Sequence, residues 1–150
     1  MNNYQSVKIA IVISTFNKDI SDNLLQGAIN KFEGFSKDRN NLLIFSVPGA
    51  FEIPGTVTKV LSIHENIDAI VTLGCVIKGE TAHFEYISSS VTDSISNISL
   101  KSNIPIIYGV LTTYNYDQAL IRSDFNQKDK GGEVMESAFK TIETYRNIEL

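Results

Sequence analysis

The residue types best suited to chemistry gather in one short segment, at Gly79, Glu80, Thr81 and His83. The run before them, residues 68–75, is mostly apolar and β-branched, as in a parallel strand that is covered on both faces. Because apolar side chains then recur at helical spacing, Gly79, Glu80 and Thr81 are expected at or near a helix start. Free backbone N–H groups and the helix dipole favour an anion there. His83, in the first turn, would accept a proton beside that anion, although an ordinary turn followed by an exposed helical histidine gives the same local pattern.

Apolar strands alternate with amphipathic helices along the chain. The expected strands are residues 7–14, 42–47, 68–75 and 106–112. The expected helices lie at about residues 20–32, 54–64, 84–100, 118–122 and 133–145, with polar loops at 34–41 and 123–132. This alternation predicts an α/β fold, namely a three-layer α/β/α sandwich with a four-stranded parallel sheet of the flavodoxin-like class.

The carboxyl ends of these strands share one edge of the sheet, which is where open α/β sheets bind ligands. Four turns are expected there, at Phe16, at residues 50–52, at residues 78–83 and at residues 112–113. Phe16 could stack on a flat substrate, and a phenylalanine in the core is the alternative. Glu52 could accept hydrogen bonds from sugar hydroxyls, and a carboxylate that only stabilises a helix start is the alternative. Since every unusual turn falls on the same edge, a binding site there is the better hypothesis.

Composition limits the classes of function. The chain has 150 residues, 43% of them apolar, which is enough for a single domain over residues 1–150 with a full core. Its net charge is −4 and it has no basic run, so nucleic acid is not expected as a partner. The single cysteine, Cys75, excludes an internal disulfide, and with two histidines it leaves too few ligands for an ordinary zinc site. The polar start lacks the pattern of a signal peptide and no apolar run approaches the ~20 residues of a membrane helix, so a cytoplasmic protein is expected.

Several of these segments, in this order, resemble the signatures of the lumazine synthase family of riboflavin biosynthesis. They are Phe16-Asn17, residues 48–54, residues 73–84, residues 104–113, Gln118-Ala119 with Arg122, and Lys130-Gly131 with Glu133. Each segment alone is a weak signal, whereas all of them in register across nearly the whole chain are specific.

The resemblance implies an enzyme that condenses 5-amino-6-ribitylamino-2,4-pyrimidinedione with 3,4-dihydroxy-2-butanone 4-phosphate. The product would be 6,7-dimethyl-8-ribityllumazine, with release of phosphate and water and without a metal or an organic cofactor. A non-catalytic carrier of lumazine or flavin is the alternative, since the same contacts would hold a bound product. An electron carrier similar to flavodoxin is disfavoured because no hydroxyl-rich phosphate loop follows the first strand.

The resemblance also implies roles for individual residues. His83 would be the catalytic residue that moves protons. The substrate-binding residues would be Phe16, Ala50, Phe51, Glu52, Cys75, Val76, Ile77, Tyr108 and Lys130. The phosphate-binding residues would be Gly79, Glu80, Thr81 and Arg122. Sites of the family lie between neighbouring subunits of a homopentamer, so Tyr108, Arg122 and Lys130 would come from the neighbour.

Some features depart from the family pattern. Only about six residues precede Val7, where family members usually carry a longer arm, and the loop 124–129 replaces a stretch commonly rich in glycine. Both features concern the assembly of pentamers into larger shells rather than the pocket. Lys78 and Tyr108 stand where arginine and phenylalanine are common, and these substitutions would act on affinity.

Overall fold

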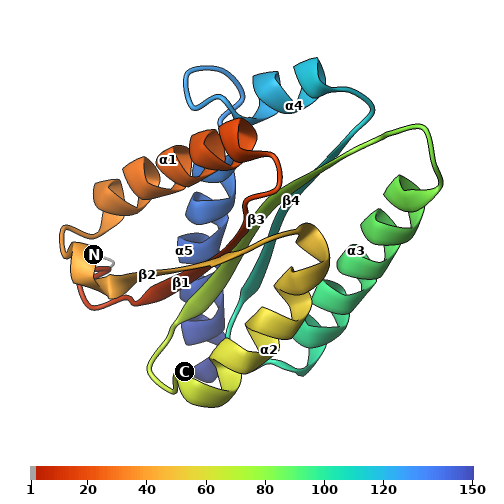
Figure 1. Cartoon of the computed structure of the whole chain (residues 1–150). Coiled ribbons are helices and arrows are strands. Elements are labelled where there is room, and N and C mark those ends of the chain that lie inside the picture. The colour runs from red at the N-terminus through yellow and green to blue at the C-terminus, as the bar shows by residue number, and fades with distance from the viewer. Residues whose placement is uncertain (1–2) are drawn as a thin grey trace.

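A parallel four-stranded sheet runs through the middle of the protein, with helices on both faces (Figure 1). This computed structural model describes residues 3–150. The strands are β1 (Ile9–Ser14), β2 (Leu42–Val47), β3 (Ala69–Ile77) and β4 (Ile106–Thr113), in the spatial order β2-β1-β3-β4. The predicted α/β/α sandwich with its parallel sheet is therefore confirmed. Because β2 and β3 flank β1 on opposite sides, the strand order reverses between β1 and β3.

In the described part of the chain, five α-helices and two short 3-10 helices connect and follow the strands. They are α1 (Lys18–Phe35), η1 (Arg39–Asn41), η2 (Ala50–Glu52), α2 (Ile53–Ile63), α3 (His83–Lys101), α4 (Tyr116–Ser123) and α5 (Lys130–Glu149). The helices α2 and α3 cover one face of the sheet, while α1 and α5 cover the other, with α4 beside them (Figure 1). None of the helices within residues 3–150 combines the length and the apolar character that crossing a bilayer requires.

The sheet is buried on both faces because its central strands carry apolar side chains on both sides. In β1, Ile11 and Ile13 belong to the core beneath α1 and α5, whereas Ala10 and Val12 belong to the core beneath α2 and α3. Burying one large aliphatic side chain stabilises the fold by about 1.5–3 kcal/mol. This double-sided packing gives the carboxyl ends of the strands fixed positions from which to present a site.

The last helix starts earlier and ends later than the sequence predicts. The expected helix covers residues 133–145, but α5 begins at Lys130 and ends at Glu149. The Asp129 side chain caps this earlier start by accepting a hydrogen bond of 3.1 Å from the Gly132 N–H. The prediction is wrong because Gly131 and Gly132 indicate a loop by composition, whereas here a glycine lets α5 approach α1 closely.

Candidate active site

A cavity of about 290 Å³, the rim pocket, opens at the carboxyl edge of the sheet beside the point where the strand order reverses. Its lining residues come from the turns after β1 and β2, the end of β3 and the first turns of α3: Phe16, Asn17, Gly49, Ala50, Phe51, Glu52, Cys75, Val76, Ile77, His83 and Ile87. The structure thus brings together Phe16, residues 50–52, residues 75–77 and His83, all of which the sequence predicts for one site. The volume lies at the lower end of the range for small-molecule sites.

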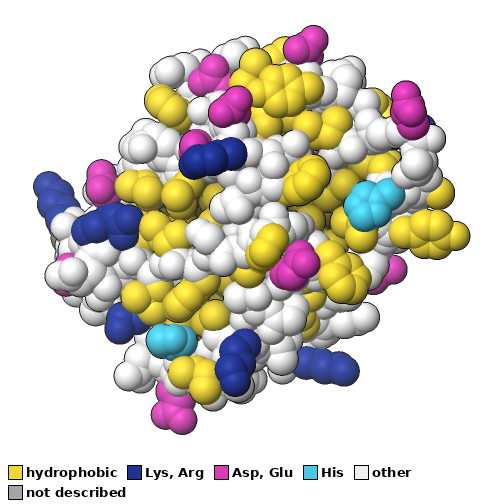
Figure 2. All heavy atoms as spheres, in the orientation of Figure 1, with side chains coloured by type: hydrophobic (Ala, Val, Ile, Leu, Met, Phe, Trp, Pro, Cys, Tyr) yellow, Lys and Arg dark blue, Asp and Glu magenta, His cyan; other side chains and the backbone are white. Residues whose placement is uncertain are grey.

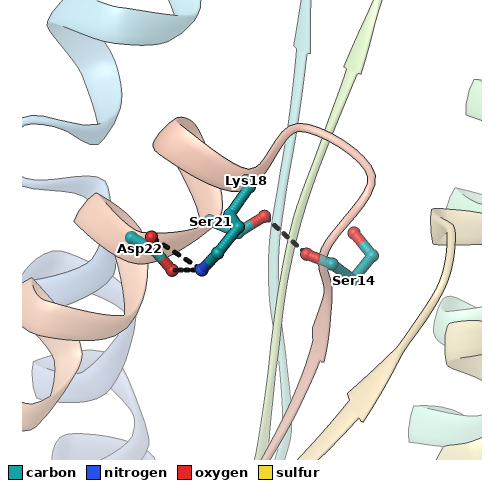
Figure 3. A network of polar contacts seen from close by, with 4 residues as sticks. All are labelled: Ser14, Lys18, Ser21 and Asp22. Carbon is teal, nitrogen blue, oxygen red and sulfur yellow. Dashed lines mark hydrogen bonds and ion pairs between the residues drawn. The ribbon is translucent and has the colours of Figure 1, made fainter.

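The turn between β1 and α1 presents Phe16 to the rim pocket. Close to this turn, the Ser21 hydroxyl donates a hydrogen bond of 2.6 Å to the Ser14 carbonyl, beside the surface ion pair of Lys18 and Asp22 (Figure 3). Ser14 and Ser21 are both buried, so this bond satisfies polar groups that would be costly to bury alone. Phe16 itself is 83% exposed, which leaves its ring free to pack on a flat ligand and excludes the alternative of a core position.

Asn17 links the turn after β1 to the end of β3, beside the rim pocket. The sequence analysis did not predict it as a site residue. It stands at the start of α1, where an asparagine favours a helix cap, but its side chain makes no capping hydrogen bond. Instead, its Nδ2 donates a hydrogen bond of 3.2 Å to the Cys75 carbonyl at the end of β3. Its position directly after Phe16, at a strand end, is the signal that could have identified it.

Glu52 is held at the rim pocket by the turn that follows β2. It ends η2 and directly precedes α2, as predicted for a carboxylate at a helix start. Its Oε2 accepts a hydrogen bond of 3.2 Å from the Gly49 N–H. A carboxylate has two oxygens, so Oε1 can still accept a hydrogen bond from a ligand hydroxyl. Ala50 and Phe51 lie in the same turn, and Phe51 is largely exposed.

The end of β3 offers backbone groups to the rim pocket. β1 pairs with β3 only as far as Leu73, whereas the pairing between β3 and β4 continues to Ile77. β3 therefore extends beyond β1. At residues 75–77, the backbone edge of β3 that faces β1 is not paired with β1. Backbone N–H and C=O groups on such an edge can bond to the polar rim of a planar ligand.

Cys75 contributes a thiol that is not reactive near neutral pH. Burial raises the pKa of the Cys75 thiol to about 12, and a hydrogen bond with the Thr113 side chain opposes this shift only in part. The thiolate is the nucleophilic form of cysteine, so a thiol with this pKa is a poor nucleophile. Cys75 therefore shapes the pocket and takes no covalent part in a reaction there.

The helix α3 begins at His83, which confirms His83 in the first turn and places Gly79, Glu80 and Thr81 near the helix start, just before it. These residues lie in the loop before the helix, because the chain needs residues 78–82 to turn from β3 back over the sheet. The Thr81 hydroxyl accepts a hydrogen bond of 3.3 Å from the His83 N–H, which ties the loop to the first residue of α3. His83 is exposed and lines the rim pocket, whereas the three loop residues are exposed beside it and do not line it.

A second depression of about 360 Å³, the basic pocket, is formed by β4, α4, α5 and the loop between those two helices. Its lining residues are Tyr108, Val110, Leu111, Thr112, Arg122, Lys128, Lys130 and Glu133. None of them lines the rim pocket. Tyr108, Arg122 and Lys130, which the sequence predicts for the same site as His83, thus lie together but in a separate pocket.

The basic pocket presents cations in defined positions. Arg122 donates a hydrogen bond of 3.2 Å from Nη1 to a backbone carbonyl of its own helix, which orients the guanidinium. The Lys130 ammonium lies 3.1 Å from the Glu133 carboxylate. Lys128 is a further cation that sequence reasoning missed, and the signal for it is a basic residue two positions before Lys130.

Comparison with known proteins gives one consistent result. The family model described as 6,7-dimethyl-8-ribityllumazine synthase matches residues 6–146. The chain belongs to this family. A 6,7-dimethyl-8-ribityllumazine synthase of Limosilactobacillus reuteri (strain DSM 20016) is 42% identical over 146 residues, which are 97% of this chain and 94% of the relative. Another, from Protochlamydia amoebophila (strain UWE25), is 38% identical over 148 residues, which are 99% of this chain and 86% of the relative.

In this member of the lumazine synthase family, the lysine and arginine side chains gather in one of the two pockets. The rim pocket is lined by one carboxylate, Glu52, and by no lysine or arginine, whereas the basic pocket is lined by Arg122, Lys128 and Lys130 together with one carboxylate, Glu133. Figure 2 shows hydrophobic side chains gathered around a histidine on the upper right of one face, while most lysines and arginines lie to the left and below. An anion beside His83 must therefore draw its cations from outside the rim pocket. Within residues 3–150, no three His, Cys, Asp or Glu side chains are grouped so that they could hold a metal ion.

Proposed function

We propose that this chain catalyses the condensation of 5-amino-6-ribitylamino-2,4-pyrimidinedione with 3,4-dihydroxy-2-butanone 4-phosphate. The products are 6,7-dimethyl-8-ribityllumazine, phosphate and water. The observation that carries the proposal is the rim pocket of a family member, where an exposed aromatic ring, a carboxylate and an imidazole line one cavity. The aromatic ring can stack on the flat pyrimidine, the carboxylate can bind the hydroxylated ribityl chain, and the imidazole can move the proton that the reaction transfers.

The pyrimidine substrate is proposed to occupy the rim pocket. Phe16 stacks on the ring, and backbone groups at residues 75–77 bond to the polar edge of the ring. Glu52 accepts hydrogen bonds from hydroxyls of the ribityl chain, which lies along the turn at residues 50–51.

The phosphate of the second substrate is proposed to bind beside His83, at Gly79, Glu80 and Thr81. α3 begins at His83, directly after this loop, and free backbone N–H groups and the helix dipole at a helix start favour an anion. Arg122 supplies the cation, because a guanidinium binds phosphate through two parallel hydrogen bonds. Since Arg122 lines the basic pocket and His83 the rim pocket, we infer that the two pockets meet across a contact between chains.

The assembly proposed for this contact is a homopentamer. In a closed ring of identical head-to-tail contacts, the basic pocket of each chain faces the rim pocket of the next. Tyr108, Arg122 and Lys130 of one subunit then complete the site of its neighbour. A single chain would hold both halves of a site but no complete site.

His83 is proposed to move protons during the reaction. The amine of the pyrimidine attacks the ketone carbonyl, and loss of a water molecule leaves an imine. A proton then leaves the adjacent carbon as the C–O bond to phosphate breaks, and His83 is placed beside both the loop and the pocket to accept it. Loss of phosphate leaves an enol at the hydroxyl-bearing carbon, and protonation of its terminal carbon converts it to a methyl ketone. The ribityl-bearing nitrogen then attacks this new carbonyl, and loss of a second water molecule closes the ring.

The proposed setting is the cytoplasm, with no metal, no organic cofactor, no membrane and no nucleic acid as partner. The net charge of −4 supports this view of the partners, because an acidic protein without a basic run repels polyanions. Small anionic substrates can still bind where cations are concentrated locally, as in the basic pocket.

The experiment that tests the proposal supplies the purified protein with both substrates. The lumazine chromophore is followed optically and the released phosphate is measured in the same samples. Formation of both in equal amounts is expected. Tight binding of the lumazine without turnover by the assembled protein would contradict the proposal and would favour a carrier.

A further inference from the structure

The start of α5 has an unusual backbone conformation. Asp129 has φ 46° and ψ 54°, and among residues 3–150 no other non-glycine residue has a positive φ. This left-handed conformation is unfavourable for most side chains and least so for asparagine and aspartate. A residue keeps such a conformation only when the surrounding structure requires it, and such residues cluster at functional sites.

The Asp129 carboxylate fixes the start of α5. It accepts a hydrogen bond of 3.1 Å from the Gly132 N–H, and the Asp129 carbonyl accepts the first helical hydrogen bond, 2.9 Å long, from Glu133. Gly27 of α1 lies directly beneath this carboxylate, because a β-carbon at Gly27 would overlap it. A β-carbon at Gly131 would overlap the backbone of α1, so α5 is docked on α1 without intervening side chains.

Lys130 follows Asp129 directly and projects from this docked start into the basic pocket. Its side chain is 33% exposed, and its ammonium lies 3.1 Å from the Glu133 carboxylate. Lys130 and Glu133 both lie in the first turn of α5, so their ion pair ties the position of the ammonium to the position of this helix start. The hydrogen bond between the Asp129 carboxylate and the Gly132 N–H therefore determines where the Lys130 ammonium can contact a substrate.

We propose that Asp129 is a positioning residue for the condensation, acting through Lys130 by holding the start of α5 on α1. The inference rests on the proposed function, since it takes Lys130 as part of the substrate site. A shift of about 1 Å in a group that contacts substrate can reduce the rate about 100-fold. Asp129→Ala, which loses both the cap and the tolerance for positive φ, is therefore expected to lower kcat/KM for the butanone phosphate by about 10- to 100-fold.

Two other variants separate positioning from charge and from folding. Asp129→Asn keeps an oxygen that can cap Gly132 and tolerates positive φ, so kcat/KM is expected to stay within about threefold of the unmodified protein. Gly27→Ala leaves Asp129 in place but pushes its carboxylate away, and it should reproduce the loss seen with Asp129→Ala.

The matched control is Asp38→Ala, which removes the aspartate that caps η1 through a 3.0 Å bond to the Asn40 N–H. Asp38 lines neither pocket, so Asp38→Ala should lower the free energy of unfolding and leave kcat/KM unchanged.

The decisive measurement is a double-mutant cycle with Lys130→Met. If Asp129 acts through Lys130, adding Asp129→Ala to Lys130→Met changes kcat/KM by less than about twofold. Losses that multiply in the double variant would overturn the inference, as would an equal loss in Asp38→Ala or normal kinetics in both Asp129→Ala and Gly27→Ala. If the unmodified protein forms no product, the proposed function fails and this inference with it. If the unmodified protein is active but the cycle shows no coupling between Asp129 and Lys130, this inference fails and the proposed function stands.

Discussion

Truncation of Phe16 tests the binding mode in the rim pocket without disturbing the fold. The residue is 83% exposed, so Phe16→Ala removes little buried surface from the chain. Its effect on the free energy of unfolding should remain within about 0.5 kcal/mol, as for other surface substitutions. Stacking of an aromatic ring on a nucleobase-like ring is worth about 1–3 kcal/mol. That range corresponds to a loss of about 5- to 150-fold in affinity for the pyrimidine.

The assay is steady-state kinetics in which each substrate is varied in turn. The KM for the pyrimidine should rise by about 5- to 150-fold in Phe16→Ala, while the KM for the butanone phosphate changes little. Phe16→Tyr keeps the stacking surface and should behave like the unmodified protein. Phe16→Leu keeps apolar area without a π-system, so its KM should lie between the two.

Two results would refute this reasoning. An unchanged pyrimidine KM in Phe16→Ala would mean that the exposed ring does not cover the substrate. A large fall in the midpoint of thermal unfolding would mean that Phe16 supports the structure, and its kinetic effect would then say nothing about stacking.

Further predictions concern three other groups in the two pockets. Arg122→Ala should raise the KM for the butanone phosphate by about 10- to 150-fold, the equivalent of a charge-assisted hydrogen bond, and an unchanged KM would contradict the phosphate role. His83→Ala should lower kcat by about 100-fold, the lower part of the range for acid–base catalysis, because the attacking amine is already nucleophilic; normal turnover would exclude the proposed role. The Cys75 thiol, with its pKa raised from 9.0 to about 12, should hold about a thousandfold less thiolate at pH 8 in the folded protein than in the unfolded protein, and should therefore react much more slowly with a disulfide reagent when folded. The same shift makes the Cys75 contribution to stability complete below pH 9, and that contribution is lost as the pH rises toward about 12, which urea titrations at several pH values would measure.

The sequence was sufficient to predict the fold and the edge of the sheet that carries the rim pocket. Strand β2 begins and ends where its apolar run does, because Gly34 to Asn41 before it and Pro48-Gly49 after it interrupt the pattern. Parallel strands end at a common edge, so the turns that carry Phe16, Glu52 and His83 had to meet there. This part of the site follows from topology alone.

Other features depend on contacts between segments far apart in the chain. The start of α5 could not be predicted, because Gly131 and Gly132 are helical only through their close approach to α1 and the cap from Asp129. The start of α3 at His83 depends on how many residues the chain needs to turn from β3, which no local pattern gives. The separation of Arg122 from the rim pocket within one chain was expected from the family resemblance alone, because hydrophobic periodicity does not define the path of β4 and α4.

The central claim is that each site combines the rim pocket of one chain with the basic pocket of another, and mixing of inactive chains tests it most directly. His83→Ala damages only the rim pocket and Arg122→Ala only the basic pocket. In rings assembled at random from equal amounts of both, about one quarter of the sites receive an intact rim pocket and an intact basic pocket. Chains unfolded and refolded together should therefore recover about one quarter of the unmodified activity at a low concentration of the butanone phosphate. A mixture no more active than the two variants refolded separately would contradict the claim.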